Sequence, residues 1–210
     1  MIRPFDDTTR RNIAERCAAF ARLPANEPAP ALKRAAVVIA LVEADLAAFG
    51  TAILFTRRAA GLRAHRGQWA LPGGRRDEGE SPVTAALREL HEELGLEVGS
   101  GDVLGLLDDY PTRSGYLVTP VVVWAGKGAS LSPNPAEVAS VHRIGLDAIE
   151  QQDAFDFVTI PESTRRVIRF RYINRFIHAP TAAMIYQFRE VLAGRDTRVA
   201  ELEQPVFAWK

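Results

Sequence analysis

Residues 74–96 read GRRDEGESPVTAALRELHEELGL, and this stretch gives the strongest indication of the fold. Ser81 can cap a helix that starts at Pro82, and Gly95 is well placed to end it. Four apolar residues fall on one narrow stripe of the helical wheel, which predicts the core-facing side: Val83, Leu87, Leu90 and Leu94. The stretch therefore predicts a loop followed by an amphipathic helix.

Three glutamates lie on the nearly opposite arc of this helix, at positions i, i+3 and i+4: Glu89, Glu92 and Glu93. Like charges at this spacing repel each other by roughly 0.2–0.5 kcal/mol per pair. One interpretation is a solvated acidic surface. The other is a site for hard divalent cations, which prefer oxygen ligands, offset the repulsion and can bridge phosphate oxygens and activate water. The helix alone leaves both interpretations open.

The residues around the helix favour the cation site. They follow the spacing Gly, any five, Glu, any seven, Arg-Glu-apolar-any-Glu-Glu-any-Gly-apolar, filled by Gly74, Glu80, Arg88, Glu89, Leu90, Glu92, Glu93, Gly95 and Leu96. This pattern resembles the Nudix box at every position, and its seven fixed letters match by chance about once in 10⁸ frames. The resemblance implies an α/β fold, a Nudix α/β/α sandwich with a mixed β-sheet and added N- and C-terminal helices. It also implies Mg²⁺ or Mn²⁺ as cofactor and hydrolysis of a diphosphate joined to another group.

The same resemblance implies roles for single residues of the box. Glu92 and Glu93 match metal ligands, and Glu89 matches either a ligand or the base that deprotonates the attacking water. Arg88 matches an arginine that orients a glutamate and offsets the acidic cluster. The carbonyl of Gly73 is a further candidate ligand.

Two more glutamates have both a possible functional role and a simpler structural explanation. Glu80 is expected to hold the loop of the box rather than to catalyse, with a metal role left open. Glu137 resembles a loop glutamate that supplies a base or a further metal contact in some Nudix enzymes, although its residue type alone predicts an ordinary surface position.

The stretch before the box narrows the expected substrate. Residues 54–74 read LFTRRAAGLRAHRGQWALPGG. This resembles the signature of coenzyme A pyrophosphatases: Leu-Leu-Thr-x-Arg-Ser/Ala, three residues, Arg, three, Gly, three, Phe-Pro-Gly-Gly. Phe55 and Leu71 depart from it, and both stay apolar. The resemblance covers about residues 35–145, and also includes LDDYPTRSG at 107–115 and NPAEV at 134–138.

The implied substrate is coenzyme A or acyl-CoA, cleaved to 3′,5′-ADP and 4′-phosphopantetheine, and the substrate-binding candidates are Arg58, Arg63, His65, Gly67 and Gly74. Residues 54–76 contain six arginines and no acidic residue, and arginine binds phosphate oxygens bidentately. Pairing with Asp77, Glu78 and Glu80 would explain several of these arginines equally well. An exposed loop is the commoner explanation for His65, and packing is the commoner one for Trp69.

The C-terminal third fits the coenzyme A branch less well. Residues 177–182 keep the frame of the motif Ile-Trp-Gly-x-Thr-Ala but lack its Trp and Gly. A second basic run precedes them and alternates in part with apolar residues, as on a solvated strand face: Arg165, Arg166, Arg169, Arg171 and Arg175. The changed frame keeps another nucleoside diphosphate as an alternative substrate. A non-catalytic nucleotide-sensing domain is a second alternative, which the intact box opposes.

The strands and helices expected in the rest of the chain predict a mixed sheet covered on both faces. We expect strands at Ala35–Val42 and Ala52–Phe55, two strands within 100–125 of which Leu117–Trp124 is the clearer, and weaker strands at Val138–Ile144 and Ser163–Ile173. Helices are expected from about Asp7 to Leu23, with Cys17 on the apolar side, and at Thr181–Leu192. The expected divisions are 1–32 (N-terminal helix and Pro-rich connector), 33–194 (Nudix domain) and 195–210 (tail).

Composition excludes several classes of protein. The 210 residues carry 26 basic and 26 acidic side chains, with 47% apolar and 25% charged residues, which is typical of a globular protein and not of a disordered chain. Zero net charge argues against nucleic-acid and membrane partners. A single cysteine and the lack of a long apolar segment predict a cytoplasmic protein. The oligomeric state is open, and the apolar tail could dock on its own domain or in a homodimer.

Overall fold

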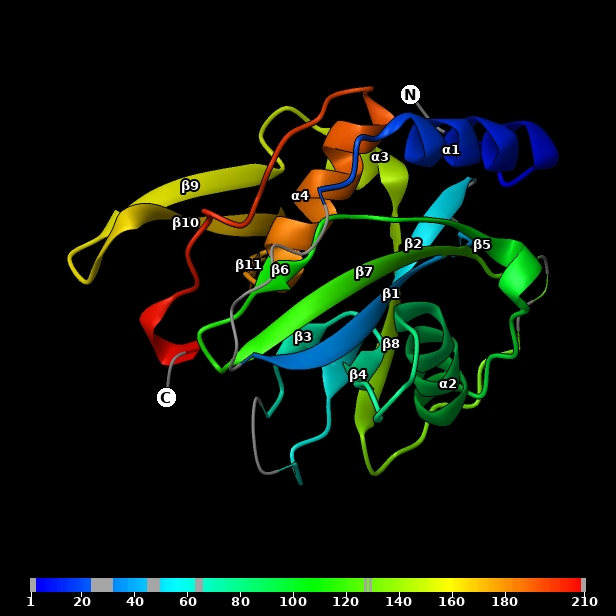
Figure 1. The fold of residues 1–210 in the computed structure, drawn as a ribbon, viewed down its shortest axis with the longest axis horizontal. Coiled ribbons are helices and arrows are strands. Elements are labelled where there is room, and N and C mark those ends of the chain that lie inside the picture. Colours follow the sequence, from blue (N-terminus) through cyan, green and yellow to red (C-terminus); the bar gives the residue numbers. More distant parts are fainter. Residues whose placement is uncertain are drawn as a thin grey trace.

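The computed structural model describes residues 3–23, 32–44, 50–62, 66–126, 128 and 130–208. The main sheet is built around the apolar run at 35–42 (Figure 1). Its strands are β1 (Lys33–Glu43), β2 (Thr51–Arg58), β3 (Trp69–Ala70), β4 (Gly73–Arg75), β5 (Val103–Leu106), β6 (Tyr110–Pro111), β7 (Tyr116–Trp124) and β8 (Val138–Gly145). β1 pairs in parallel with β7 and antiparallel with β2 and β4, so the sheet is mixed, as predicted.

Helices cover both faces of this sheet. Side chains alternate along β1, so that Ile39 and Leu41 enter one core while Val38 and Ala40 enter the other. The first core lies under α1 (Asp7–Ala19), α3 (Leu146–Glu150) and α4 (Thr181–Leu192), and the second lies under α2 (Pro82–Leu94). The predicted α/β/α sandwich is confirmed (Figure 1).

The boundaries of two helices were predicted correctly from local signals. The hydroxyl of Ser81 accepts a hydrogen bond from the N–H of Thr84, and Gly95 ends α2 with a φ of 66°. α4 has the predicted bounds. The prediction for the first helix is wrong at its C-terminal end, because Phe20 adopts extended backbone and places its buried side chain under Arg198. Cys17 is buried, as expected.

The chain also forms a second sheet that the sequence patterns do not predict. β9 (Phe155–Ile160), β10 (Ser163–Tyr172) and β11 (Arg175–His178) form a separate antiparallel sheet that extends away from the main one (Figure 1). Of these strands, only the one at 163–173 was predicted. Each strand pairs with its neighbour in sequence, and Phe170 packs on Phe55 and Phe155 without any strand joining the main ladder.

The segment after α4 packs on its own domain. Glu203, Gln204 and Pro205 are buried, and Glu203 forms a bridge with Val167 of β10. Two short 3₁₀ helices complete the described chain, η1 (Ser100–Asp102) and η2 (Val206–Ala208). Most of the Pro-rich connector lies outside the described residues. In the part of the chain that is described, no helix has the length and apolarity needed to cross a membrane.

Candidate active site

The three box glutamates of α2 have very different exposures. Glu93 is buried (4% exposed), Glu89 is half-buried, and only Glu92 has an exposed side chain (51%). α2 packs on β4 and β1, and this contact shields Glu93 and Glu89 from solvent. A fully solvated acidic surface, one of the two interpretations of this arc, is therefore wrong.

Two glycines let β4 approach both β1 and α2. A Cβ on Gly74 would lie 2.3–2.7 Å from the carboxylate of Glu89. Gly73 has a φ of +149°, and a Cβ there would lie 2.3 Å from the carbonyl oxygen of Ala36. The Pro-Gly-Gly turn is thus needed for the close packing of strand, strand and helix at this point.

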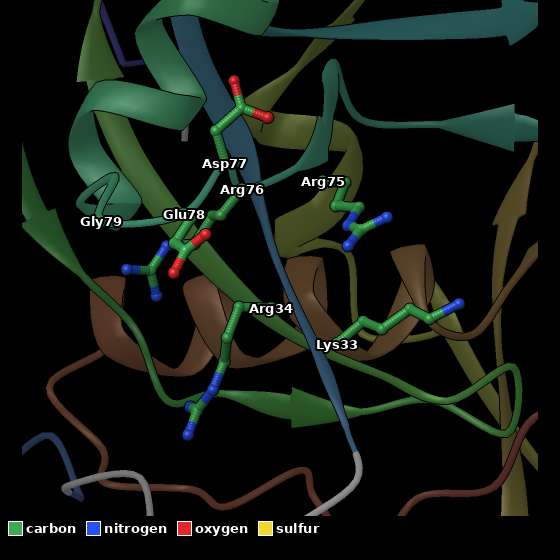
Figure 2. A pocket seen from close by; sticks show the side chains of 7 residues that line it. All are labelled: Lys33, Arg34, Arg75, Arg76, Asp77, Glu78 and Gly79. Carbon is green, nitrogen blue, oxygen red and sulfur yellow. The ribbon is translucent and has the colours of Figure 1, made fainter.

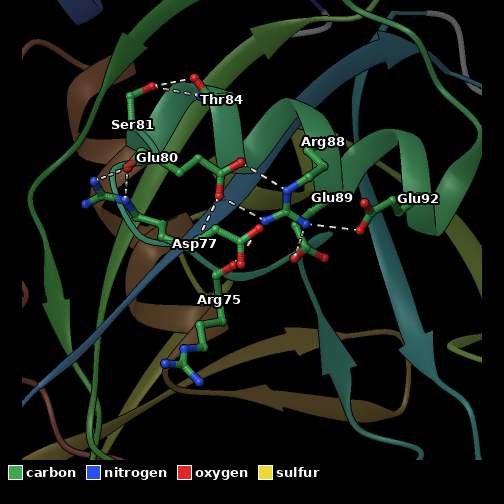
Figure 3. A network of polar contacts seen from close by, with 9 residues as sticks. Arg75, Asp77, Glu80, Ser81, Thr84, Arg88, Glu89 and Glu92 are labelled. Carbon is green, nitrogen blue, oxygen red and sulfur yellow. Dashed lines mark hydrogen bonds and ion pairs between the residues drawn. The ribbon is translucent and has the colours of Figure 1, made fainter.

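Arg88 is the centre of a polar network on the box (Figure 3). Its Nε and Nη2 each donate to the carboxylate of Glu80 at 3.0 Å, and its Nη1 donates to Glu89 at 3.0 Å and to Glu92 at 3.1 Å. Glu80 also accepts the N–H of Asp77 at 2.9 Å. The hydrogen bond from Arg88 lowers the pKa of Glu80. Glu80 therefore holds the loop against the helix.

Burial dominates the electrostatics of the acidic cluster. It raises the pKa of Glu93 to about 8; the nearby charges of Glu89 and Glu137 add to this rise, while Arg58 and the main-chain N–H of Gly73 oppose it. Burial also raises the pKa of Glu89, against the effect of Arg88. The cluster has more buried negative charge than its two arginines offset.

Arg58 and Glu137 reach this cluster from other elements. Arg58 ends β2, and its buried Nε has no hydrogen-bond partner among the described residues. Glu137 precedes β8 on a loop that caps the end of α2, where the N–H of Asn134 donates to the carbonyl of Glu93 at 2.9 Å. The loop is also tied to β2, because the N–H of Ala59 donates to the carbonyl of Glu137.

Of the other predicted substrate residues, Gly74 lies against Glu89, Gly67 lies just before β3, and two are outside the described chain. The carbonyl of Gly67, which precedes β3 in the chain, accepts hydrogen bonds from Arg57 at 2.8 and 3.2 Å. Arg63 and His65 are outside the described residues. Trp69 packs against His142 and Tyr172, with ring centroids 4.5 and 5.8 Å away.

A basic hollow of about 410 Å³ adjoins the box (Figure 2). Its cationic residues are Lys33 and Arg34 on β1 and Arg75 and Arg76 on and after β4, with Asp77, Glu78 and Gly79 completing the lining. The guanidinium of Arg76 donates to the main-chain carbonyl of Glu80, not to a carboxylate. Figure 2 shows Lys33 and Arg75 extending to the same side, so this edge of the box presents positive charge.

Comparison with known proteins identifies the family. Residues 32–163 match the model of the NUDIX domain. The chain belongs to the Nudix family. Nudix hydrolases act on a nucleoside diphosphate linked to another group and generally use divalent metal cations, so the protein is a pyrophosphohydrolase.

Two relatives are uncharacterized Nudix hydrolases named NudL. The one from Photorhabdus laumondii is 36% identical over 141 residues, which cover 66% of this chain and 75% of the relative. The one from Pectobacterium atrosepticum is 35% identical over 147 residues, covering 68% and 76%.

Solved structures share the Nudix fold. A MutT/nudix family protein from Enterococcus faecalis superposes with a TM-score of 0.55 at 19% identity, over 90% of this chain and 75% of that one. The Nudix hydrolase RenU from M. smegmatis gives 0.50 at 24% identity, over 77% and 86%. At these identities the likeness supports the fold alone.

The Nudix box residues fit a divalent cation by their donor chemistry. Glu89, Glu92, Glu93 and the carbonyl of Gly73 are hard oxygen donors, and a cation supplies the positive charge that the buried cluster lacks. Among the described residues no three acidic, histidine or cysteine side chains are grouped closely enough to hold a metal ion, and Arg88 forms ion pairs with Glu89 and Glu92.

Proposed function

We propose that this Nudix hydrolase cleaves the diphosphate of coenzyme A or an acyl-CoA, giving 3′,5′-ADP and (acyl-)4′-phosphopantetheine. The observation that carries the proposal is the position of Arg58. This residue belongs to the coenzyme A-type signature and lies at the acidic cluster, where its charge acts on Glu93. A signature arginine beside the box favours a substrate phosphate as the partner of its guanidinium.

The proposed roles follow from the geometry of the box. Glu89, Glu92, Glu93 and the Gly73 carbonyl hold Mg²⁺ or Mn²⁺, which when bound neutralises phosphate charge and lowers the pKa of water. Arg88 orients Glu89 through a 3.0 Å ion pair and stays anchored by Glu80. Two half-buried carboxylates can take a proton from water, those of Glu89 and Glu137.

The substrate contacts are proposed on the signature side of the box. Arg58 binds a phosphate, and Arg63, His65, Gly67 and Gly74 contribute the remaining contacts of the signature loop. The basic hollow formed around Lys33 and Arg75 adds positive charge at the same edge of the box.

A panel of diphosphates tests the substrate. The purified protein is incubated with Mg²⁺ or Mn²⁺ and coenzyme A, acetyl-CoA, ADP-ribose, NADH or a dinucleoside polyphosphate, and the products are separated by chromatography. We expect 3′,5′-ADP from coenzyme A and its thioester at the highest kcat/KM of the panel. Turnover of another nucleoside diphosphate without release of 3′,5′-ADP would overturn the assignment.

Two charge-removing variants test the cation ligands. Glu92→Gln and Glu93→Gln should each lower kcat at least about a hundredfold, because a lost ligand forfeits several kcal/mol of transition-state stabilisation. Glu97→Gln, an exposed glutamate just after the box, is the matched control and should keep its activity. Thermal unfolding checks that all three variants fold, and near-normal rates in the first two would contradict the ligand roles.

A further inference from the structure

A second hollow, of about 430 Å³, lies between the signature segment and the C-terminal part of the chain. One wall includes Arg57 and Trp69 from β2 and β3, and the opposite wall includes Arg175 and Phe176 from β11. Phe207 of η2 also lines it. Figure 1 shows that β3, β11 and the C-terminal end, far apart in sequence, lie on the same side of the molecule.

Two of the lining aromatic rings are exposed. Phe176 is 38% exposed and Phe207 is 55% exposed, although phenylalanine is among the residues most often fully buried. The guanidinium of Arg169 lies 4.2 Å from the centroid of Phe176, and the ring of His178 meets Phe207 edge to face at 5.1 Å. The remaining ring surface can stack a planar base.

The charge of this hollow favours an anionic ligand. None of the lining residues within the described chain is acidic. Arg57 is already engaged, since it donates twice to the carbonyl of Gly67. Arg175, in contrast, is exposed and forms no ion pair with a carboxylate in the described part of the chain, so its guanidinium is available to a phosphate.

The hollow is within reach of the box. Trp69 precedes Gly73 by four residues, which span at most about 14 Å of extended chain. A substrate whose diphosphate lies at the acidic cluster can therefore place an attached nucleoside in the hollow.

We infer that this hollow binds the 3′-phosphoadenosine end of the substrate, with adenine stacked on Phe176 and Phe207 and the 3′-phosphate bound by Arg175. The inference rests on the proposed function for the identity of the substrate. It assigns a specificity role to β11 and η2, which lie beyond residues 35–145, where the coenzyme A signature was found.

Coenzyme A and dephospho-CoA differ only in the 3′-phosphate and test the role of Arg175. The wild-type enzyme should have a KM about tenfold higher for dephospho-CoA, as expected for one charge-assisted contact. Arg175→Ala should raise the KM for coenzyme A about tenfold, leave the KM for dephospho-CoA unchanged, and keep kcat within about twofold. Arg166→Ala is the matched control, because Arg166 is an exposed arginine of β10 that lies over Phe157, outside the hollow.

Phe176 is tested separately. Phe176→Ala should raise the KM for both substrates about tenfold, because base stacking does not depend on the 3′-phosphate. Phe176→Tyr keeps the ring and should restore a near-normal KM. Thermal unfolding separates a loss of stacking from a loss of fold, and the same KM shift in Phe176→Tyr would contradict the stacking role.

Binding of adenosine 3′,5′-diphosphate without metal, measured by calorimetry, separates the two proposals. If the wild type hydrolyses coenzyme A but Arg175→Ala binds this nucleotide as tightly as wild type, the inference fails and the proposed function stands. If coenzyme A is not hydrolysed but binding depends on Arg175, the proposed function fails and the nucleotide site stands. No binding by the wild type overturns the inference in either case.

Discussion

Gly74 and Glu89 show how closely single residues are fitted at the box. The glutamate carboxylate occupies the place where any side chain at position 74 would begin, so the fixed glycine of the pattern is explained by contact with a fixed glutamate. The neighbouring Arg88 then ties this glutamate to Glu80 and Glu92. At this scale, the pattern of the box is a set of direct contacts between its own members.

Gly74→Ala should reduce activity far more than stability. The three atoms nearest to the new Cβ all belong to the flexible end of Glu89, so that side chain is displaced while the backbone can stay in place. We expect hydrolysis to fall at least about tenfold, equivalent to about 1.4 kcal/mol, with little change in Tm. Gly61→Ala is the control, since a Cβ there meets nothing within 4 Å. A normal rate in Gly74→Ala would show that Glu89 does not need its observed position.

Helix α1 and strand β5 approach each other closely where Cys17 faces Gly105. A Cβ on Gly105 would lie 2.7 Å from the Cβ of Cys17, which leaves no flexible atom to move away. The thiol of Cys17 is buried here, and burial raises its pKa to about 12. Cys17 is therefore protected from reaction as long as α1 stays packed on β5.

Gly105→Ala should push α1 away from β5. Overpacking of this kind costs about 1–3 kcal/mol, so we expect the Tm to fall by several degrees. Cys17 should also react faster with a thiol reagent under native conditions. Gly101→Ala, where a Cβ has open space, should change neither the Tm nor the labelling rate. Unchanged labelling in Gly105→Ala would mean that the helix absorbs the methyl group without moving.

The C-terminal segment connects distant parts of the molecule through Glu203. The buried carboxylate of Glu203 accepts hydrogen bonds from Arg113, between β6 and β7, and from Ser163 at the start of β10. It therefore joins the main sheet, the small sheet and the tail at one point. The hydrogen bond from Arg113, with those from the Gln204 N–H and Ser163, lowers the pKa of Glu203 to about 2.

Glu203 should make stability depend on pH in acid. A carboxyl whose pKa is lower in the folded than in the unfolded state stabilises the fold above the unfolded value, near 4.5, and loses this effect as pH falls toward 2. Glu203→Gln should lower the free energy of unfolding by about 2–3 kcal/mol at pH 7, and its difference from wild type should shrink between pH 4.5 and 2. Denaturant unfolding at several pH values measures this.

Glu201→Gln is the control for that experiment. Glu201 pairs with Arg165 at 3.3 Å, but its side chain is 81% exposed, so the change should cost less than about 1 kcal/mol. A constant difference between Glu203→Gln and wild type across the acid range would show that the ionised carboxylate is not the source of the stabilisation.

Local sequence patterns were sufficient to predict α2, α4, the central strand and the residues of the box. Their signals are local: a cap acts over three residues, as between Ser81 and Thr84, and strand or helix periodicity is complete within a few residues. Neither a helical wheel nor a strand pattern shows what covers a face. That is why the burial of Glu93 and the approach of Arg58 and Glu137 were not predictable as geometry.

Contacts between distant segments could be seen only in the three-dimensional structure. Residues 57–69 and 175–207 meet around one hollow although they are more than 100 residues apart in the chain. β9, β10 and β11 are neighbours in sequence, but their sheet meets the main one through side-chain packing. Such contacts depend on how buried apolar surfaces pack in three dimensions, and a one-dimensional pattern records no trace of them. The residues of the box lie close together in the sequence, whereas the shape of the space proposed to receive the rest of the substrate arises from tertiary packing.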